Sequence, residues 1–336
     1  MRAYRFASFG LEHLRLEDRP RPEPRPGEIR VALRAVSLNY RDLMVVTGAY
    51  NPRLPLPATP LSDGAGMVSA VGEGVTDVAV GDRVVSHFVS GWIDGPYRAA
   101  YVNTTLGLPA AGLAAEEVVL PAAAVLPVPE GYDFAEAATL PIAALTAWNA
   151  LVTEGHLEAG QTVLTLGTGG VSIFALQMAK ALGARVAITS ASDEKLARCR
   201  ALGADATVNY REHPAWDRKV REWTGGDGVD VVVENGGIGT LATSLRATRA
   251  GGTVAMLGAL TGLAGETNLA PLLMMRIRIA GILVGSRAAF AEMNAFLVRH
   301  RIRPVIGDRF PFERLTDALA HLQAQKHFGK IVVEHR

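Results

Sequence analysis

Apolar and polar positions divide the chain into regions of different character. From residue 1 to 125, short runs of alternating apolar and polar side chains are separated by glycine and proline turns, as in Glu28 to Val36 and Gly66 to Gly72. Such runs are typical of strands that bury one face. We therefore predict a compact β-rich, barrel-like unit here, with an extended proline-rich loop from Tyr50 to Pro60.

The region from 126 to 284 alternates apolar runs with helical segments. It begins with an alanine-rich helical stretch from Ala135 to Leu151. The pattern then predicts strands at 162–166, 185–189, 206–209, 229–234, 253–258 and 277–284, with helices at 172–182, 194–202 and 241–246. Near-continuous apolar strands separated by helices are typical of a parallel sheet covered on both faces.

The last region, 285–336, predicts helices at 287–299 and 315–325 and short strands near 304–306 and 330–333. The final strand most simply returns to the N-terminal β-rich unit. The predicted fold class is therefore α/β, with a doubly wound parallel sheet inserted in a β-barrel domain.

Composition and charge narrow the functional classes. Hydrophobic residues make up 49% of the chain, and 34 Lys and Arg balance 33 Asp and Glu, so we expect a globular protein with no nucleic-acid partner. Cys199 is the only cysteine, which excludes an intramolecular disulfide and four-cysteine metal sites held by this chain alone. No apolar run approaches the ~18 residues of a spanning helix. We expect a cytoplasmic protein with no membrane partner.

The strongest chemical signal is the glycine turn Gly167-Thr168-Gly169-Gly170-Val171-Ser172, which joins a predicted strand to a predicted helix. Glycines in such a turn let the backbone approach a pyrophosphate at the N-terminus of the helix. Ser172 stands at the third glycine of the G-x-G-x-x-G pattern, and a plain tight turn is the alternative. The surrounding strand–helix–strand pattern favours a dinucleotide site made by Gly167, Thr168, Gly169, Gly170 and Val171.

The end of the next strand indicates which dinucleotide binds. NAD-binding proteins place Asp or Glu there, on the ribose 2′-hydroxyl. This chain instead has Ser190-Ala191-Ser192, and Lys195 follows one turn later. Hydroxyls and an ammonium suit a 2′-phosphate, so we predict NADP as cofactor, with Tyr210 as a further contact. The alternative is that Ser192 only caps the following helix.

Several segments match a known pattern in order and spacing over nearly the whole chain. They are Asn39-Tyr40-Arg41-Asp42, Gly66 to Val75, Gly81-Asp82-Arg83-Val84, Leu145-Thr146-Ala147-Trp148, Gly167 to Ser172, Ala201 to Asp205 and His327 to Val332. These segments resemble the medium-chain dehydrogenase/reductase superfamily, and most closely its zinc-independent quinone oxidoreductases and enoyl reductases. The resemblance implies a GroES-like catalytic domain at 1–125 and 285–336, a Rossmann NADP-binding domain at 126–284, and a homodimer.

Zinc-dependent members of the superfamily bind catalytic zinc through Cys, His and Cys, with a Glu beside the His. Local alignment puts Asn39, Ser62 and Ile142 at these positions and Asp63 at the Glu position. An amide and an aliphatic side chain cannot replace two thiolates. We therefore predict no metal site.

Without a Lewis acid, enones and quinones are easier hydride acceptors than simple ketones. Hydride addition gives them a delocalised anion that hydrogen-bond donors and one proton can stabilise. The resemblance places Asn39 and Tyr40 at the nicotinamide cleft and Tyr50 at the proton-donating tyrosine of enoyl reductases, so these three are the candidate catalytic residues. For each tyrosine the alternative is a packing role. The resemblance also implies cofactor contacts from Thr146, Asn235, Leu257, Gly258, Val284, Gly285, Phe328 and Lys330.

Together these features predict an NADPH-dependent, zinc-independent oxidoreductase that transfers hydride to activated alkenes (enones) or to quinones. An alcohol dehydrogenase or carbonyl reductase that works without zinc is the alternative enzyme. The third possibility is a non-enzymatic NADPH-binding protein.

Overall fold

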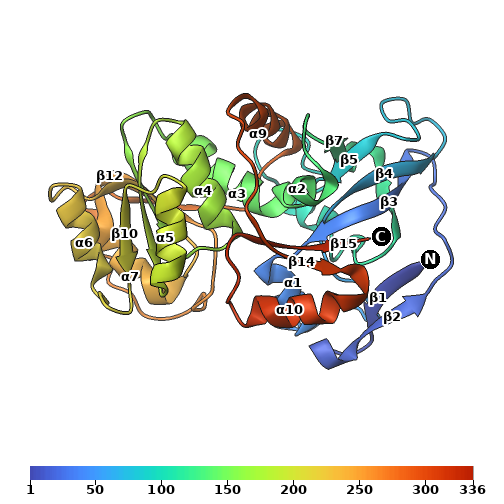
Figure 1. The fold of residues 1–336 in the computed structure, drawn as a ribbon, viewed down its shortest axis with the longest axis horizontal. Helices are drawn as coiled ribbons and strands as arrows, with labels where there is room; N and C mark the ends of the chain where they lie inside the picture. Colours follow the sequence, from blue (N-terminus) through green and yellow to red (C-terminus); the bar gives the residue numbers. More distant parts are fainter. Residues whose placement is uncertain (336) are drawn as a thin grey trace. The chain divides into compact units, whose positions relative to one another are not determined.

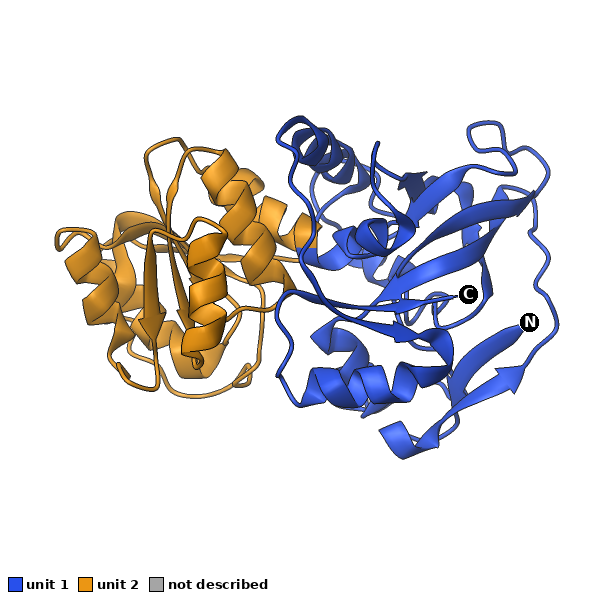
Figure 2. Cartoon of the chain, viewed as in Figure 1, with its two compact units in different colours: residues 1–143, 285–336 blue, residues 144–284 orange. Residues whose placement is uncertain are grey.

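The computed structural model describes residues 1–335, which form two compact units (Figure 1). The first unit joins residues 1–143 to 285–336, and the second spans residues 144–284 (Figure 2). The sequence interpretation placed the first division at residue 125. The structure places it after Ala143 because helix α2 (Phe134–Ala138) packs against strands β3 (Glu28–Ser37) and β4 (Asp63–Val71) of the first unit.

The first unit is built on a mixed sheet in the order β14-β15-β3-β4-β5-β7, with β6 also paired to β3. Strands β1 and β2 form a separate antiparallel pair. The remaining strands are β1 (Arg2–Phe6), β2 (Leu14–Asp18), β5 (Arg83–Ser86), β6 (Glu117–Pro121), β7 (Val125–Pro127), β14 (Ile306–Pro311) and β15 (Lys330–Glu334). The helices are α1 (Tyr40–Val46), α2, α9 (Arg287–Arg299) and α10 (Leu315–Gln323).

Strand β15 joins the two ends of the chain within this unit. It pairs in parallel with β14 and antiparallel with β3, where Val332 lies opposite Ser37. The predicted return of the final strand to the N-terminal sheet is therefore observed. This pairing brings the start of β15 beside the residues that follow β3, where the candidate catalytic Asn39 lies.

The second unit is a parallel sheet in the order β10-β9-β8-β11-β12-β13, the strand order of the doubly wound Rossmann fold. Its strands are β8 (Thr162–Leu166), β9 (Arg185–Ser190), β10 (Ala206–Asn209), β11 (Val229–Glu234), β12 (Thr248–Met256) and β13 (Arg278–Gly281). Its helices are α3 (Leu145–Trp148), α4 (Gly170–Ala181), α5 (Asp193–Ala201), α6 (Trp216–Trp223), α7 (Ile238–Ala247) and α8 (Ala270–Met274). The predicted fold class is confirmed.

The helical stretch predicted from Ala135 to Leu151 is interrupted. The segments η4 (Leu140–Ala144) and η5 (Asn149–Thr153) are π-helical turns on either side of α3. Pro141 within η4 has no backbone N–H to donate, which weakens a regular helix at this point. The next residue, Ile142, donates its N–H to the Asp63 carboxylate instead, 3.2 Å away. The interruption therefore places the Ile142 N–H against the Asp63 carboxylate.

Within residues 1–335, no helix combines the length and apolarity needed to cross a membrane.

Candidate functional site

The glycine turn between β8 and α4 has the geometry of an anion cradle. Gly167 adopts φ +73°, in the left-handed region that glycine tolerates. Gly169 is the N-cap of α4, makes no side-chain capping bond, and has open space where a Cβ would stand. The first N–H groups of this 12-residue helix are therefore left for a ligand, as a pyrophosphate requires. The residues present fit a dinucleotide.

Ser172, which departs from the glycine pattern, is held by a long-range contact. Its hydroxyl donates to Leu166 O at 2.7 Å and accepts a bond from Asn235 Nδ2 at 2.7 Å. The second Nδ2 hydrogen of Asn235 is donated to Leu166 O at 2.8 Å. The sequence interpretation made Asn235 a cofactor contact. The structure uses both of its N–H groups to brace the glycine turn, so only its oxygen is left for a ligand.

Glu234 is a functional residue whose role sequence reasoning missed. It ends β11 with its carboxylate fully buried. One oxygen accepts from the backbone N–H of Gly236 and Gly237 and from Thr240 Oγ1, and the other accepts from Ser244 Oγ. An acid at the end of a continuous apolar strand was the available signal. These bonds fix the loop that carries Asn235.

The end of β9 gathers the residues assigned to the 2′-phosphate. Ser190 ends the strand, and its carbonyl accepts a bond from the Tyr210 N–H at 3.1 Å. Ser192 Oγ accepts from the backbone N–H of Lys195 at 3.3 Å, so it caps α5 as the alternative interpretation held. Capping uses the oxygen of Ser192 and leaves its O–H as a donor. No acidic side chain ends β9, although Asp193 and Glu194 stand in the first turn of α5.

The remaining candidates for the cofactor divide between the two units. The N–H groups of Leu257 and Gly258 both donate to Glu234 O, which joins the loops after β11 and β12. Thr146 is buried in α3, and Val284 O accepts a bond from Asn149 Nδ2. These residues belong to the second unit, whereas Gly285, Phe328 and Lys330 belong to the first.

Asn39, the first candidate catalytic residue, is held in one orientation by a buried polar cluster. Its Nδ2 donates to Asp63 Oδ2 at 2.8 Å, and its Oδ1 accepts from Lys330 Nζ at 2.7 Å. Its backbone N–H donates to Asp42 Oδ2 at 2.8 Å. Ser62 Oγ donates to the other oxygen of Asp42 at 3.4 Å. Asn39 is half-buried, whereas the four residues around it are buried.

Burial dominates the electrostatics of this cluster. It raises the pKa of the Asp42 and Asp63 carboxyls and lowers the pKa of the Lys330 ammonium, because each charged form loses its contact with water. The charge of Lys330 opposes the shift in both acids. Asp63 and Lys330 therefore titrate as a coupled pair rather than independently.

The cluster does not fit a zinc ion. The Asn39 oxygen is taken by a lysine ammonium, whose charge would repel a dication. Ser62 is bonded to Asp42, and Ile142 contributes only a backbone N–H. Among residues 1–335, no three His, Cys, Asp or Glu side chains gather closely enough to hold a metal.

Tyr40 and Tyr50 are both exposed. The Tyr50 ring lies 4.5 Å from the guanidinium carbon of Arg41, which also lies 5.1 Å from the Phe88 ring. Arg41 donates to the carbonyls of Gly107 and Leu108. The guanidinium fixed in this way holds the Tyr50 ring by a cation–π contact.

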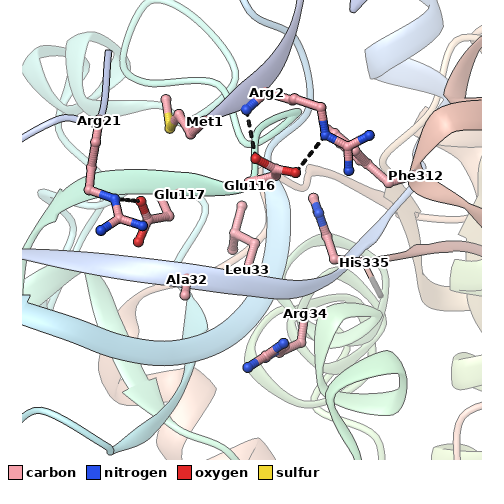
Figure 3. A pocket seen from close by; sticks show the side chains of 10 residues that line it. All are labelled: Met1, Arg2, Arg21, Ala32, Leu33, Arg34, Glu116, Glu117, Phe312 and His335. Carbon is pink, nitrogen blue, oxygen red and sulfur yellow. Dashed lines mark hydrogen bonds and ion pairs between the residues drawn. The ribbon is translucent and has the colours of Figure 1, made fainter. Parts of the chain in front are cut away.

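A separate cavity of about 260 Å³ opens beside β1 and β3 in the first unit (Figure 3). Two ion pairs lie in its walls, Arg2 with Glu116 at 2.7 Å and Arg21 with Glu117 at 2.6 Å. None of the candidate catalytic or cofactor residues lines it. We therefore do not assign it to the reaction.

Comparisons with known proteins agree with this architecture. Residues 25–130 match the alcohol dehydrogenase GroES-like domain, and residues 170–299 match the zinc-binding dehydrogenase domain. A zinc-type alcohol dehydrogenase-like protein of Schizosaccharomyces pombe is 40% identical, over 97% of this chain and 96% of its own length. A quinone oxidoreductase of Pseudomonas aeruginosa is 33% identical, over 98% of both chains.

A solved structure described as an NAD-dependent alcohol dehydrogenase is 38% identical, with a TM-score of 0.91 over 99% of each chain. The resemblance seen in the sequence is thus supported over the full length by relatives and by fold. The chain belongs to the medium-chain dehydrogenase/reductase superfamily of oxidoreductases.

Proposed function

We propose that this protein is an NADPH-dependent, zinc-independent reductase of activated alkenes or quinones. The observation that carries the proposal is the Asn39 cluster, where zinc-dependent members of the superfamily hold their metal. Here an amide is fixed between Lys330 Nζ and Asp63 Oδ2, so the position presents a hydrogen-bond donor rather than a ligand. Such a donor suits a delocalised enolate better than the localised alkoxide of a simple alcohol.

The cofactor would supply the hydride. The glycine turn and the free N-terminus of α4 would hold the pyrophosphate. Ser190, Ser192 and Lys195 would hold the 2′-phosphate, because no acid stands at the end of β9 to repel it.

Tyr50 is the proposed proton donor to the reduced substrate. Its phenol is exposed, so it can exchange protons with water, and the contact with Arg41 holds its ring in place. Asn39 would hold the substrate oxygen while its charge develops. Tyr40, also exposed, would line the substrate site.

A second candidate is an NAD(P)-dependent alcohol dehydrogenase or carbonyl reductase, favoured by the similarity to an NAD-dependent alcohol dehydrogenase. A steady-state screen decides between the two. Oxidation of NADPH and NADH is followed with enones, quinones, aldehydes and enoyl thioesters. We expect enones or quinones to consume NADPH fastest. Faster turnover of aldehydes would favour the second candidate, and tight NADPH binding with no acceptor at all would favour a non-enzymatic role.

The choice of cofactor has its own test. Ser190→Asp restores an acid to the end of β9, where it would repel a 2′-phosphate. We expect NADPH to bind at least about tenfold more weakly, since losing one charge-assisted contact costs roughly 1.5–3 kcal/mol. NADH should bind no worse, and Ser190→Ala is the matched control. Equal binding of NADPH and NADH by the wild type would reject the assignment.

We also propose a homodimer formed through the second unit. β13 lies at the edge of the parallel sheet, and large apolar side chains of the neighbouring segment are exposed, among them Leu263, Leu273 and Met274. Light scattering after size exclusion should give twice the chain mass. Leu273→Glu with Met274→Glu should shift the mass toward the monomer.

A further inference from the structure

Lys330 is an unusual feature of the first unit because a lysine is rarely buried without a direct ion pair. Its side chain is 3% exposed, and its ammonium donates to two neutral acceptors, Leu38 O and Asn39 Oδ1, each at 2.7 Å. The buried carboxylates of Asp42 and Asp63 attract it without bonding to it directly. The positive charge therefore acts on its surroundings mainly through the Asn39 amide.

The hydrogen bonds of Asn39 determine which way its amide points. When Lys330 and Asp63 are both charged, the ammonium only donates and the carboxylate only accepts, so Oδ1 faces Lys330 and Nδ2 faces Asp63. If the amide were flipped, its N–H groups would face the Lys330 ammonium and its oxygen would face the Asp63 carboxylate. The second Nδ2 hydrogen has no partner among the described residues. Asn39 thus offers one oriented N–H from a half-buried position.

Lys330 also strengthens that donor. An amide that accepts a bond from an ammonium has more positive N–H groups, because hydrogen bonds in series polarise one another, and more so where water is excluded. Loss of the ammonium would leave the Asn39 amide free to flip and would make its N–H a weaker hydrogen-bond donor.

We propose that Lys330 is a positioning residue, which holds and polarises Asn39 so that its free N–H stabilises the oxygen of the substrate anion. This inference rests on the proposed function. In that reaction one alkene carbon gains a hydride, the π electrons move to the carbonyl oxygen as an enolate, and the other carbon then gains a proton. In this proposal Lys330 acts through Asn39, whereas the resemblance implied that it contacts the cofactor.

The test compares Lys330→Met with the double variant Lys330→Met/Asp63→Asn. The single variant leaves the buried Asp63 carboxylate without its neighbouring cation, so its Tm should fall. The double variant removes one charge of each sign and keeps an acceptor for Asn39, so its Tm should recover. Lys219→Met, at an exposed ion pair on α6, is the control for the substitution itself.

We expect kcat for enone reduction to stay about 10- to 100-fold low in the double variant, since a weakened oxyanion donor acts on the transition state. The dissociation constant for NADPH should stay near that of the wild type. Recovery of kcat together with Tm overturns the proposal, because Lys330 would then be only structural. Weaker NADPH binding with unchanged kcat also overturns it, because Lys330 would then contact the cofactor.

A second measurement does not depend on turnover. The side-chain amide resonances of Asn39, assigned with Asn39→Asp, are compared in the double variant and in Asp63→Asn alone. We expect the two proton shifts to move together when Lys330 is absent, and identical spectra would overturn the proposal. If none of the acceptors supports NADPH oxidation by the wild type but the Asn39 proton shifts still move, the proposed function fails. The positioning of Asn39 by Lys330 then still stands.

Discussion

The brace between Asn235 and the glycine turn predicts a coupled effect on cofactor binding. Asn235→Ala removes two bonds to Leu166 O and Ser172 Oγ, and Ser172→Ala removes the bond to Leu166 O and the acceptor for Asn235. At about 0.5–1.5 kcal/mol per bond, each variant loses about 2 kcal/mol of support for the turn. If binding of NADPH must bring the glycine turn back into its ordered conformation, NADPH binds about 30-fold more weakly to each variant.

The double variant carries the decisive information. Both substitutions break the bond between Asn235 and Ser172, so the double variant loses three bonds rather than four, and its loss should be smaller than the sum of the single losses. The expected coupling free energy is that of the shared bond, about 1 kcal/mol. The dissociation constants for NADPH are measured by fluorescence titration in the four proteins of the cycle, with exposed Asn103→Ala as control. Additive losses, or wild-type binding by Asn235→Ala, would refute the idea that these residues act as one brace.

Three further predictions address the first unit. Tyr50→Phe should lower kcat on an enone by about 10²- to 10⁴-fold, and an unchanged kcat would exclude Tyr50 as the acid. Burial lowers the pKa of His87 to about 4, so the unfolded chain takes up a proton first as pH falls below 6.5, and folding free energy is lost. Between pH 7 and 4.5, the free energy of unfolding of His87→Gln should fall by about 2 kcal/mol less than that of the wild type, as measured by denaturant titration. Equal losses in the two proteins would contradict this. Gly66→Ala puts a Cβ 2.1 Å from a strand carbonyl oxygen and should cost about 3 kcal/mol or more; Gly281→Ala, which meets open space, should leave Tm unchanged.

The sequence was most informative where local pattern and fold agree. The apolar run of β8, its glycine turn and the helix after it were predicted within a few residues, because strand periodicity and turn chemistry are local properties. The π-helical turns around α3 were not predicted, because an alanine-rich stretch has helical propensity throughout. The first of these turns contains Pro141 and a bond from Ile142 to Asp63, which lies 79 residues away in the sequence.

The polar partners of the site were beyond local pattern. Asn39 and Lys330 were both singled out, but for different roles, because their contact spans 291 residues and exists only through the pairing of β15 with β3. Asn235 was singled out as a cofactor contact, but the Glu234 carboxylate that holds its loop was not, because its role depends on donors on α7. A sequence shows which polar residues are unusual, and the fold shows what satisfies them.

The two departures from the family pattern therefore have one physical explanation. Ser172 replaces a glycine, and Asn39 replaces a metal-binding cysteine. Each puts a polar side chain where an unpaired buried group costs about 1–3 kcal/mol. Each is satisfied by a distant partner, Asn235 at 63 residues and Lys330 at 291. It follows that neither position can be interpreted alone. A relative with serine in the turn but an apolar residue at the Asn235 position would need another donor for that serine. A relative with asparagine before α1 but no buried cation would present an amide that is free to flip.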